Sequence, residues 1–346
     1  MKQIIFKGKF TTLSPFCSSD PSDRKSNETE TRKIAVCYGG QVYRVPFLSP
    51  NTIRSMLRDN TAKDIIEKFP NEMGYKELLF LTSGGNLEGK DKAGKELKNK
   101  TVLERIREIR NNNIVASIFG GALFHLNKLI PGKLSCGVGY LECRETTGRE
   151  ELPSFESFIG RNLQFVRSDD TDRWEFFSAL SVEGVAEKEE YEKMYKESSK
   201  KRKEEKKKQS NEEKAEEEDI GSLEQEEGFR TVSAQMIWKI SDYVTKDATF
   251  RHELLLVNPT PAEVGALIRA FVRFSEYPYL GCFKNIGFGK MKVEYDIYEI
   301  EEKTNYLGSI AVNDTKQFSY NGAKIENALL EYEKYLQTLT YDKIKI

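Results

Sequence analysis

The sequence predicts an α+β fold in which helices cover one face of an antiparallel sheet. Several runs alternate apolar and polar residues, as in "KQIIFKGKFTTL" near the start and "MKVEYDIYEI" near the end. This alternation is typical of strands that bury only one face. Two other runs, "PNTIRSMLRD" and "PAEVGALIRAFVRF", repeat their apolar residues at helical spacing. Strands alternating with such helices indicate a sheet with helices packed on it.

The first part of the chain predicts a strand, a hairpin and a helix. "KQIIFKGKFTTL" is the strand, the polar stretch "SSDPSDRKSNETETRK" is a loop, and "KIAVCYGGQVYRVPF" is a hairpin that turns at its Gly-Gly pair. The helix begins at Ser49 and Pro50, because serine accepts from the free amides of a helix start and proline suits its first position. Ile53, Met56 and Leu57 form the apolar stripe that packs it on the sheet.

The middle of the chain interrupts this pattern. It contains a glycine- and lysine-rich loop, "LFLTSGGNLEGKDKAGKELKNK", and a helical run, "TVLERIREIRNNNIVASIFGGALFHLNKL". "CGVGYLECRE" returns to strand character, and residues 150–185 mix aromatic with charged side chains. Residues 187–227 consist mainly of Lys, Glu and Arg, which predicts a solvated helical or disordered excursion, with a binding arm as the alternative.

The last part resumes the strand pattern. "AQMIWKISDYV" and "FRHELLLVNPT" predict strands, Pro261 opens a helix, "MKVEYDIYEI" is a further strand, and the amphipathic tail "AKIENALLEYEKYLQTL" is expected to dock on the body. Without the insertions, the order is strand, helix, strands, helix, strand. That order predicts a ferredoxin-like core, as in RNA-recognition motifs, with large helical and loop insertions.

The sequence predicts six parts of the chain. They are 1–69, the first part of the core with the arginine-bearing helix; 70–133, an inserted helical and glycine/lysine-rich region; 134–186, a strand return with aromatic and charged residues; 187–227, the charged excursion; 228–301, the second part of the core; and 302–346, the tail helix.

Charge and cysteine usage limit the class of protein. Residues 187–227 hold 11 basic and 16 acidic residues, a net charge of −5, and the remainder, with 43 basic and 39 acidic residues, carries +4. A mildly basic body permits nucleic-acid binding without requiring it. Five scattered cysteines, no secretory signal and no long apolar run predict a cytoplasmic protein that does not enter the membrane.

Residues for catalysis are few. The chain has two histidines, His125 in an apolar run and His252 in a strand, and both are expected to be structural. No phosphate-binding loop, dinucleotide fingerprint or nucleophile elbow occurs. A zinc site from Cys136, Cys143 and a histidine is conceivable, but its spacing matches no zinc knuckle. We therefore expect no cofactor, no metal and no enzymatic activity.

The helix after the hairpin carries two arginines, Arg54 and Arg58, one turn apart on one side. Two interpretations stand for this pair. It can be an ordinary solvated helix face, since such pairs are common. It can also be a phosphate site, because the planar guanidinium offers a fork of donors that matches phosphate oxygens.

A glycine-rich loop, "GCFKNIGFGKM", lies between the second core helix and the last core strand. In it Gly287 and Gly289 flank Phe288, with Lys284 and Lys290 on either side. Glycines let a backbone approach a polyanion closely and lysines neutralise it, although ordinary tight turns look the same. "SIFGGALF" and "TSGGNLEGK" supply two further glycine pairs.

Together, "VPFLSPNTIRSMLRD", "FGGALFHLNKLIPGKL" and "CFKNIGFGKM" resemble the RAMP superfamily of CRISPR-associated proteins, and are most similar to the backbone (Cas-seven-like) subunit of type IV effector complexes. In that family an early helix with the pattern proline, small residue, Asn or Ser, x-Arg-x-x-Leu-Arg lies against guide RNA. The residues of this chain that carry the pattern are Pro50, Asn51, Thr52, Ile53, Arg54, Leu57 and Arg58. The family's late glycine-rich loop maps onto residues 281–290.

The resemblance implies a non-catalytic subunit that oligomerises along CRISPR (guide) RNA in an antiviral ribonucleoprotein filament and presents the guide for pairing with target DNA or RNA. It implies as partners copies of the chain, a large subunit, a cap subunit, a guide-processing endonuclease and, as a further candidate, an accessory helicase. The resemblance also implies a thumb, a protruding hairpin that wedges the guide at regular intervals. We expect it within residues 150–185, with Phe155, Phe158, Arg161 and Phe165 as its candidate residues. The implied RNA-binding residues are Asn51, Thr52, Arg54, Ser55, Arg58, Gly120, Gly121, Lys128, Lys133, Phe155, Phe158, Arg161, Lys284, Asn285, Gly287, Phe288, Gly289 and Lys290.

Two alternatives remain open within the same superfamily. Type III relatives that cleave target RNA place an aspartate between the first strand and the arginine helix, where this chain has Asp20 and Asp23 without the expected glycine-rich setting. Other relatives process precursor guide RNA as monomers, and the scarcity of histidine argues against that activity.

Overall fold

The computed structural model describes residues 2–19, 28–70, 72–85, 99–123, 128–166 and 237–344. Contacts divide the chain into two units. One comprises Met1–Leu163 with Ile240–Ile346, and the other comprises Gln164–Lys239, of which only the ends of two strands are described. Within the described ranges, no helix combines the length and apolar character needed to cross a membrane.

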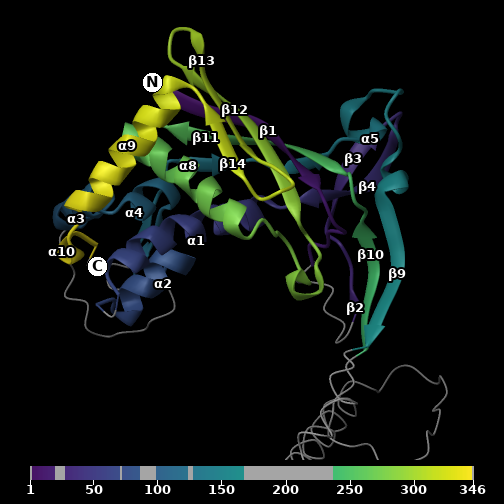
Figure 1. The fold of residues 1–346 in the computed structure, drawn as a ribbon, viewed down its shortest axis with the longest axis horizontal. Coiled ribbons are helices and arrows are strands. Elements are labelled where there is room, and N and C mark those ends of the chain that lie inside the picture. Colours follow the sequence, from purple (N-terminus) through teal and green to yellow (C-terminus); the bar gives the residue numbers. More distant parts are fainter. Residues whose placement is uncertain are drawn as a thin grey trace, which may run out of the picture. The chain divides into compact units, whose positions relative to one another are not determined.

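A large antiparallel sheet organises the first unit (Figure 1). Its strands follow the order β14-β13-β12-β1-β11-β8-β4-β3, and β7 also pairs with β11. Their bounds are β1 Gln3–Thr12, β3 Lys33–Tyr38, β4 Gln41–Leu48, β7 Leu134–Cys136, β8 Gly139–Leu141, β11 Thr249–Val257, β12 Met291–Ile300, β13 Thr304–Val312 and β14 Phe318–Asn321. The central strand β1 alternates buried Phe6 and Phe10 with exposed Lys7 and Lys9, so one face is apolar and the other charged.

Helices cover the apolar face. The described helices are α1 Pro50–Lys68, α2 Tyr75–Ser83, α3 Asn99–Asn112, α4 Ile114–Phe119, α5 Arg144–Thr147, α8 Pro261–Glu276, α9 Ala323–Thr338 and α10 Tyr341–Ile344. Helix α8 lies between α1 and α9 (Figure 1). Gly265 makes the α8–α9 approach possible, because a β-carbon there would lie 2.0 Å from the carbonyl oxygen of Ala328. Helix α8 starts in a capping box formed by Thr260 and Glu263.

The remaining described elements are short. They are β2 Glu28–Thr29, β5 Gly121–Leu123, β6 Lys128–Ile130, β9 Ile159–Val166, β10 Ile237–Val244 and the 3-10 turns η3 Phe155–Phe158 and η4 Lys284–Ile286. Strands β2, β10 and β9 form a second sheet, and β5 pairs with β6.

The structure confirms the α+β class, with helices and an antiparallel sheet. The first strand, the hairpin at the Gly-Gly pair, both core helices, the late core strand and the docked tail helix occur where the sequence predicts them. The predicted helical run to about residue 129 is wrong. It ends at Phe119, because Gly120 has φ +67° and the chain then enters the β5–β6 hairpin. Helix α2 and strands β13 and β14 were not predicted. Residues 167–236, with the charged excursion, lie outside the described residues.

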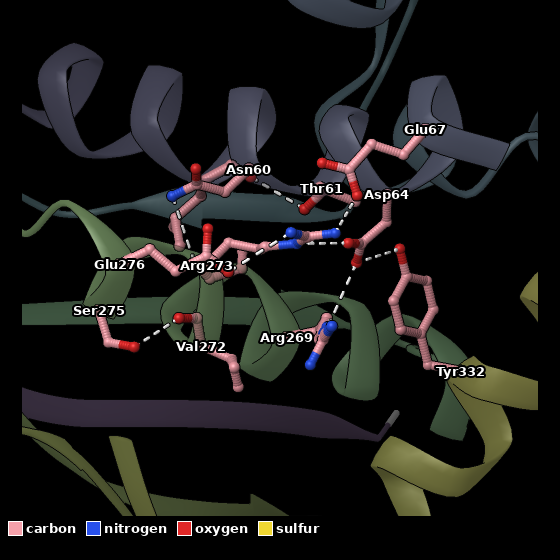
Figure 2. Close-up of polar contacts among 12 residues, drawn as sticks. Asn60, Thr61, Asp64, Glu67, Arg269, Val272, Arg273, Ser275, Glu276 and Tyr332 are labelled. Atoms are coloured by element: carbon pink, nitrogen blue, oxygen red, sulfur yellow. Dashed lines mark hydrogen bonds and ion pairs between the residues drawn. The ribbon is translucent and has the colours of Figure 1, made fainter. Parts of the chain in front are cut away.

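A buried carboxylate joins the three helices (Figure 2). Asp64 on α1 accepts a hydrogen bond from the Arg273 Nε on α8 at 2.7 Å and from the Tyr332 hydroxyl on α9 at 3.3 Å. Arg269 approaches the same carboxylate at 3.6 Å, and Arg273 also pairs with Glu67. Burial lowers the pKa of Arg273, but hydrogen bonds and charge from Asp64 and Glu67 outweigh it and leave the pKa above its ordinary value. The cluster therefore fixes the orientation of α1.

We predict that Arg273→Met lowers the free energy of unfolding by about 3–5 kcal/mol, because it leaves the buried Asp64 charge without its main partner. Arg269→Met on the same helix is the matched control, since Arg269 is more exposed and farther from the carboxylate. We expect it to cost less than about 1 kcal/mol. Urea denaturation followed by circular dichroism measures both. Equal losses for the two variants would show that Asp64 does not depend on Arg273.

Candidate nucleic-acid interface

Helix α1 carries polar residues on two sides. On one side, Asn51, Thr52 and Ser55 line a groove of about 410 Å³ together with Lys284 of the glycine-rich loop. The other lining residues are Ser18, Ser19, Arg32, Met56, Asp59, Leu280, Gly281 and Cys282. The tertiary structure thus brings the start of α1 and the glycine-rich loop, which are distant in sequence, to one concave surface.

Arg32 enters the groove from the chain before β3 and was not among the predicted site residues. Its guanidinium donates to the Ser49 hydroxyl at 3.4 Å, beside the first turn of α1. The Ser49 side chain makes no capping hydrogen bond, so the helix start keeps amide donors that are not capped by a side chain. No local sequence pattern marks Arg32, because only the pairing of β3 with β4 places it at this helix.

One carboxylate, Asp59, also lines the groove. It accepts from the Ser55 hydroxyl at 3.4 Å. Partial burial raises the pKa of Asp59, while Ser55 and the charges of Arg58 and Lys284 act in the opposite direction. The groove therefore holds two cations, Arg32 and Lys284, and one carboxylate.

The arginine pair lies on the other side of α1, against the inserted region. The Arg54 guanidinium donates to the carbonyl oxygens of Phe119 and, at 3.4 Å, of Leu134. Arg58 donates to the carbonyl of Gly120, and its guanidinium carbon lies 5.6 Å above the Phe119 ring. Both arginines thus hold the turn that ends α4.

The charge of this pair is not neutralised within the described residues. Neither Arg54 nor Arg58 forms an ion pair with a described carboxylate, and the Nε of Arg58 is buried without a hydrogen-bond partner. Arg58 is only 8% exposed. Burial and the neighbouring charge of Arg54 lower the pKa of Arg58 to about 10. Two adjacent cations bonded only to neutral carbonyls are an arrangement that an anion would stabilise.

The glycine-rich loop contains exposed and buried positions. Lys284, Asn285 and Gly287 are exposed on η4 and the turn after it. Phe288 is buried against Tyr243 and Phe283, and Gly289 is buried against Leu280. Lys290 donates to the carbonyl of Asp314 at 3.1 Å. Phe288 and Gly289 therefore support the loop from inside instead of facing a ligand.

The other predicted residues are dispersed. Lys133 pairs with the buried Glu263 at 2.7 Å, and exposed Arg161 pairs with Glu156 at 2.5 Å. Phe155 is buried and Phe158 half-buried in the core. Gly120 is buried and Gly121 half-buried beside the arginine pair. Nothing is described of the Lys128 and Phe165 side chains, and Asp20, Asp23 and His125 lie outside the described residues.

A second groove, of about 500 Å³, is lined in part by His252. The His252 Nε2 lies 3.1 Å from the Gly137 carbonyl and 3.5 Å from the Cys136 sulfur, while Nδ1 bonds the Tyr295 hydroxyl. A carbonyl only accepts, so Nε2 carries the proton and has no lone pair with which to activate the cysteine. Burial raises the pKa of Cys136 to about 12. This cluster is therefore unsuited to nucleophilic catalysis.

The proposed zinc ligands are not assembled. Cys143 contacts Thr146 at the start of α5, and Cys136 contacts His252. In the ranges that the structure describes, no three His, Cys, Asp or Glu side chains gather as a metal site would require.

Comparisons with known proteins give distant similarities to solved structures. No protein-family model matches the sequence, and no curated protein sequence matches it. A chain of a solved structure titled "Type IV-B CRISPR Complex" is similar with a TM-score of 0.48 and 11% sequence identity, over 85% of this chain and 90% of that chain.

We predict that His252 stays neutral in the folded protein down to pH about 4, because burial lowers its pKa from 6.5 to about 4. The unfolded chain takes up this proton first, so the associated stability is complete above pH 6.5 and is lost as the pH falls toward 4. The chain has two histidines, so a His125→Gln variant leaves only the imidazole signal of His252. An NMR titration of that variant measures the pKa of His252. A measured pKa near 6.5 would contradict the prediction.

Proposed function

We propose that this chain binds guide RNA as a non-catalytic backbone subunit of a type IV CRISPR effector complex and oligomerises along the guide. The observation that carries the proposal is that Arg54 and Arg58, two adjacent cations, form no ion pair with any carboxylate in the part of the chain that the structure describes. A phosphate at this position would satisfy the orphaned Arg58 Nε and relieve the repulsion between the two guanidinium groups. Both arginines belong to the motif on which the family resemblance rests.

The groove on the neighbouring side of α1 supports the same function. Its cations, Arg32 and Lys284, line the groove together with exposed Asn51 and Ser55 and half-buried Thr52, which supply amide and hydroxyl groups. Such groups contact phosphate and sugar without reading base sequence. A subunit that leaves base reading to the guide needs only this kind of complementarity. We propose that the RNA backbone passes from the arginine pair to the groove.

We further assign the core to the ferredoxin-like class. Strands β12, β1, β11 and β7–β8 are adjacent in that order, and α1 and α8 provide the two crossovers. This is the strand order expected if β1, β7–β8, β11 and β12 are the four core strands. The proposal also includes filament assembly, the thumb and the partner subunits. These elements rest on the family resemblance alone.

We predict that the double variant Arg54→Gln with Arg58→Gln binds guide RNA more weakly than the unaltered chain. Glutamine keeps a donor for the carbonyls of Phe119 and Gly120 but removes the charge. Each lost phosphate contact makes the salt dependence of binding shallower by about one unit of slope. Lysine at both positions restores the charge without the fork and should recover binding only in part. Fluorescence anisotropy with labelled guide RNA at several salt concentrations measures both effects.

Arg149→Gln is the matched control, because Arg149 is exposed and distant in sequence from the motif. It should leave affinity and salt slope unchanged, and thermal unfolding must show that every variant is folded. A folded double variant with the affinity and slope of the unaltered chain would return the arginines to a purely structural role.

We also predict that the assembled protein does not cleave a matched RNA in the presence of Mg²⁺ or Mn²⁺. Gel analysis of labelled target RNA tests this. Cleavage that is abolished by Asp20→Ala or Asp23→Ala would favour the type III alternative instead. Cleavage confined to precursor guide RNA by a monomer would favour the processing alternative.

A further inference from the structure

Two tyrosines, one exposed and one half-buried, form an aromatic pair just after α8. The rings of Tyr277 and Tyr279 lie 4.5 Å apart, centre to centre, with an angle of 31° between their planes. Tyr277 is 52% exposed. Neither tyrosine belongs to the arginine pair or lines the groove. Tyr277 lies at the surface, outside the packed core.

The local backbone brings the two rings together. The chain makes a tight turn at Pro278, where the backbone N–H of Tyr279 donates to the Tyr277 carbonyl at 2.8 Å, and this turn brings the two tyrosines together. Pro278 and Leu280 are buried, whereas Tyr277 is exposed and Tyr279 is half-buried. Backbone bonds hold this turn, with Met291 N donating to the Pro278 carbonyl at 2.9 Å and Leu280 N to the Gly289 carbonyl at 2.8 Å. The pair is therefore fixed in place before any ligand binds.

Lysines flank the pair. The Lys316 Nζ lies 6.0 Å from the centre of the Tyr279 ring, and Lys290 forms a bridge with Tyr279 through the backbone. Lys316 has a φ of +64°, a backbone conformation that lysine rarely adopts and that the surrounding turn must stabilise. The nearby acidic residues are Asp314, whose carbonyl accepts from Lys290, and Glu276, which pairs with Arg273 at 3.4 Å.

We propose that Tyr277 and Tyr279 are a stacking platform for an unpaired base of single-stranded nucleic acid. A fixed ring with a free face and adjacent cations is the arrangement by which proteins hold single strands without reading sequence. The platform is continuous in sequence with the groove, because Leu280 and Gly281 follow Tyr279 and line it. This inference rests on the proposed function and extends the bound strand beyond the phosphate contacts.

The chain contains a matched pair for comparison. Tyr298 and Tyr306 have ring centres 5.5 Å apart, and Tyr306 is 55% exposed. The Tyr306 hydroxyl donates to the Asp296 carboxylate at 3.4 Å, so this second pair stands in acidic surroundings that repel a phosphate backbone. The two tyrosine pairs are similarly exposed but lie in surroundings of opposite charge. Comparing variants of the two pairs therefore separates stacking on nucleic acid from a general effect of exposed aromatic rings.

The test measures binding of labelled oligouridine by the full chain. Tyr277→Ala should weaken binding about tenfold, since stacking contributes on that order for each base. Tyr277→Phe and Tyr306→Ala should stay within about twofold of the unaltered chain. The salt slope of Tyr277→Ala should not change, because no ionic contact is lost, whereas the arginine variants make it shallower. In the assembled complex, photocrosslinking of 5-iodouridine placed in the guide or in the target strand identifies which strand supplies the base.

The outcomes separate the two proposals. Unchanged affinity in folded Tyr277→Ala, with binding that still depends on Arg54 and Arg58, overturns the platform and leaves the proposed function standing. Loss of self-association with unchanged oligouridine affinity also overturns it and assigns the tyrosines to a protein interface. Failure of the unaltered chain to bind RNA overturns both.

Discussion

The ion pair between Asp64 and Arg273 is the interaction on which the arrangement of the functional surface depends. It joins α1 to α8, and Tyr332 adds α9 to the same carboxylate. A buried carboxylate tolerates few alternative positions, because any displacement leaves a charge without its partner. The rotation of α1 about its own axis is thereby fixed. That rotation determines which residues of the helix face the groove and which face the inserted region.

Helix α1 is asymmetric in how its charges are satisfied. Its C-terminal half places Asp64 and Glu67 against arginines of α8. Its N-terminal half places Arg54 and Arg58 against carbonyl oxygens, and neither arginine forms an ion pair with a carboxylate of the described residues. A chain that needed only stability would gain little by placing the buried Arg58 beside the half-buried Arg54 in this way. The difference between the two halves is the physical basis for assigning the N-terminal half to an anionic ligand.

Particular elements show how far sequence patterns reach. The alternation in "MKVEYDIYEI" predicted β12 with its full extent, and Pro261 marked the start of α8, because both signals are local. The helical run through residue 129 failed at Gly120, where a positive φ and a neighbouring strand outweighed the local preference. Phe288 reads from sequence as an exposed loop aromatic, yet Tyr243 and Phe283 bury it. Arg32 gave no signal at all, since only a strand pairing brings it to α1.

The sequence by itself determined the α+β class, the core helices with their start signals, and the two segments from which the proposed site is built. Those features depend on residues close together in the chain, so local spacing expresses them. The tertiary structure alone decided that Arg54 and Arg58 contact the turn that ends α4, that Asn51 and Ser55 share a groove with Lys284, and that Tyr277 and Tyr279 pair at the surface. The partners of the α1 residues lie tens to hundreds of residues away, and only packing of the sheet and helices fixes which side of the helix meets them.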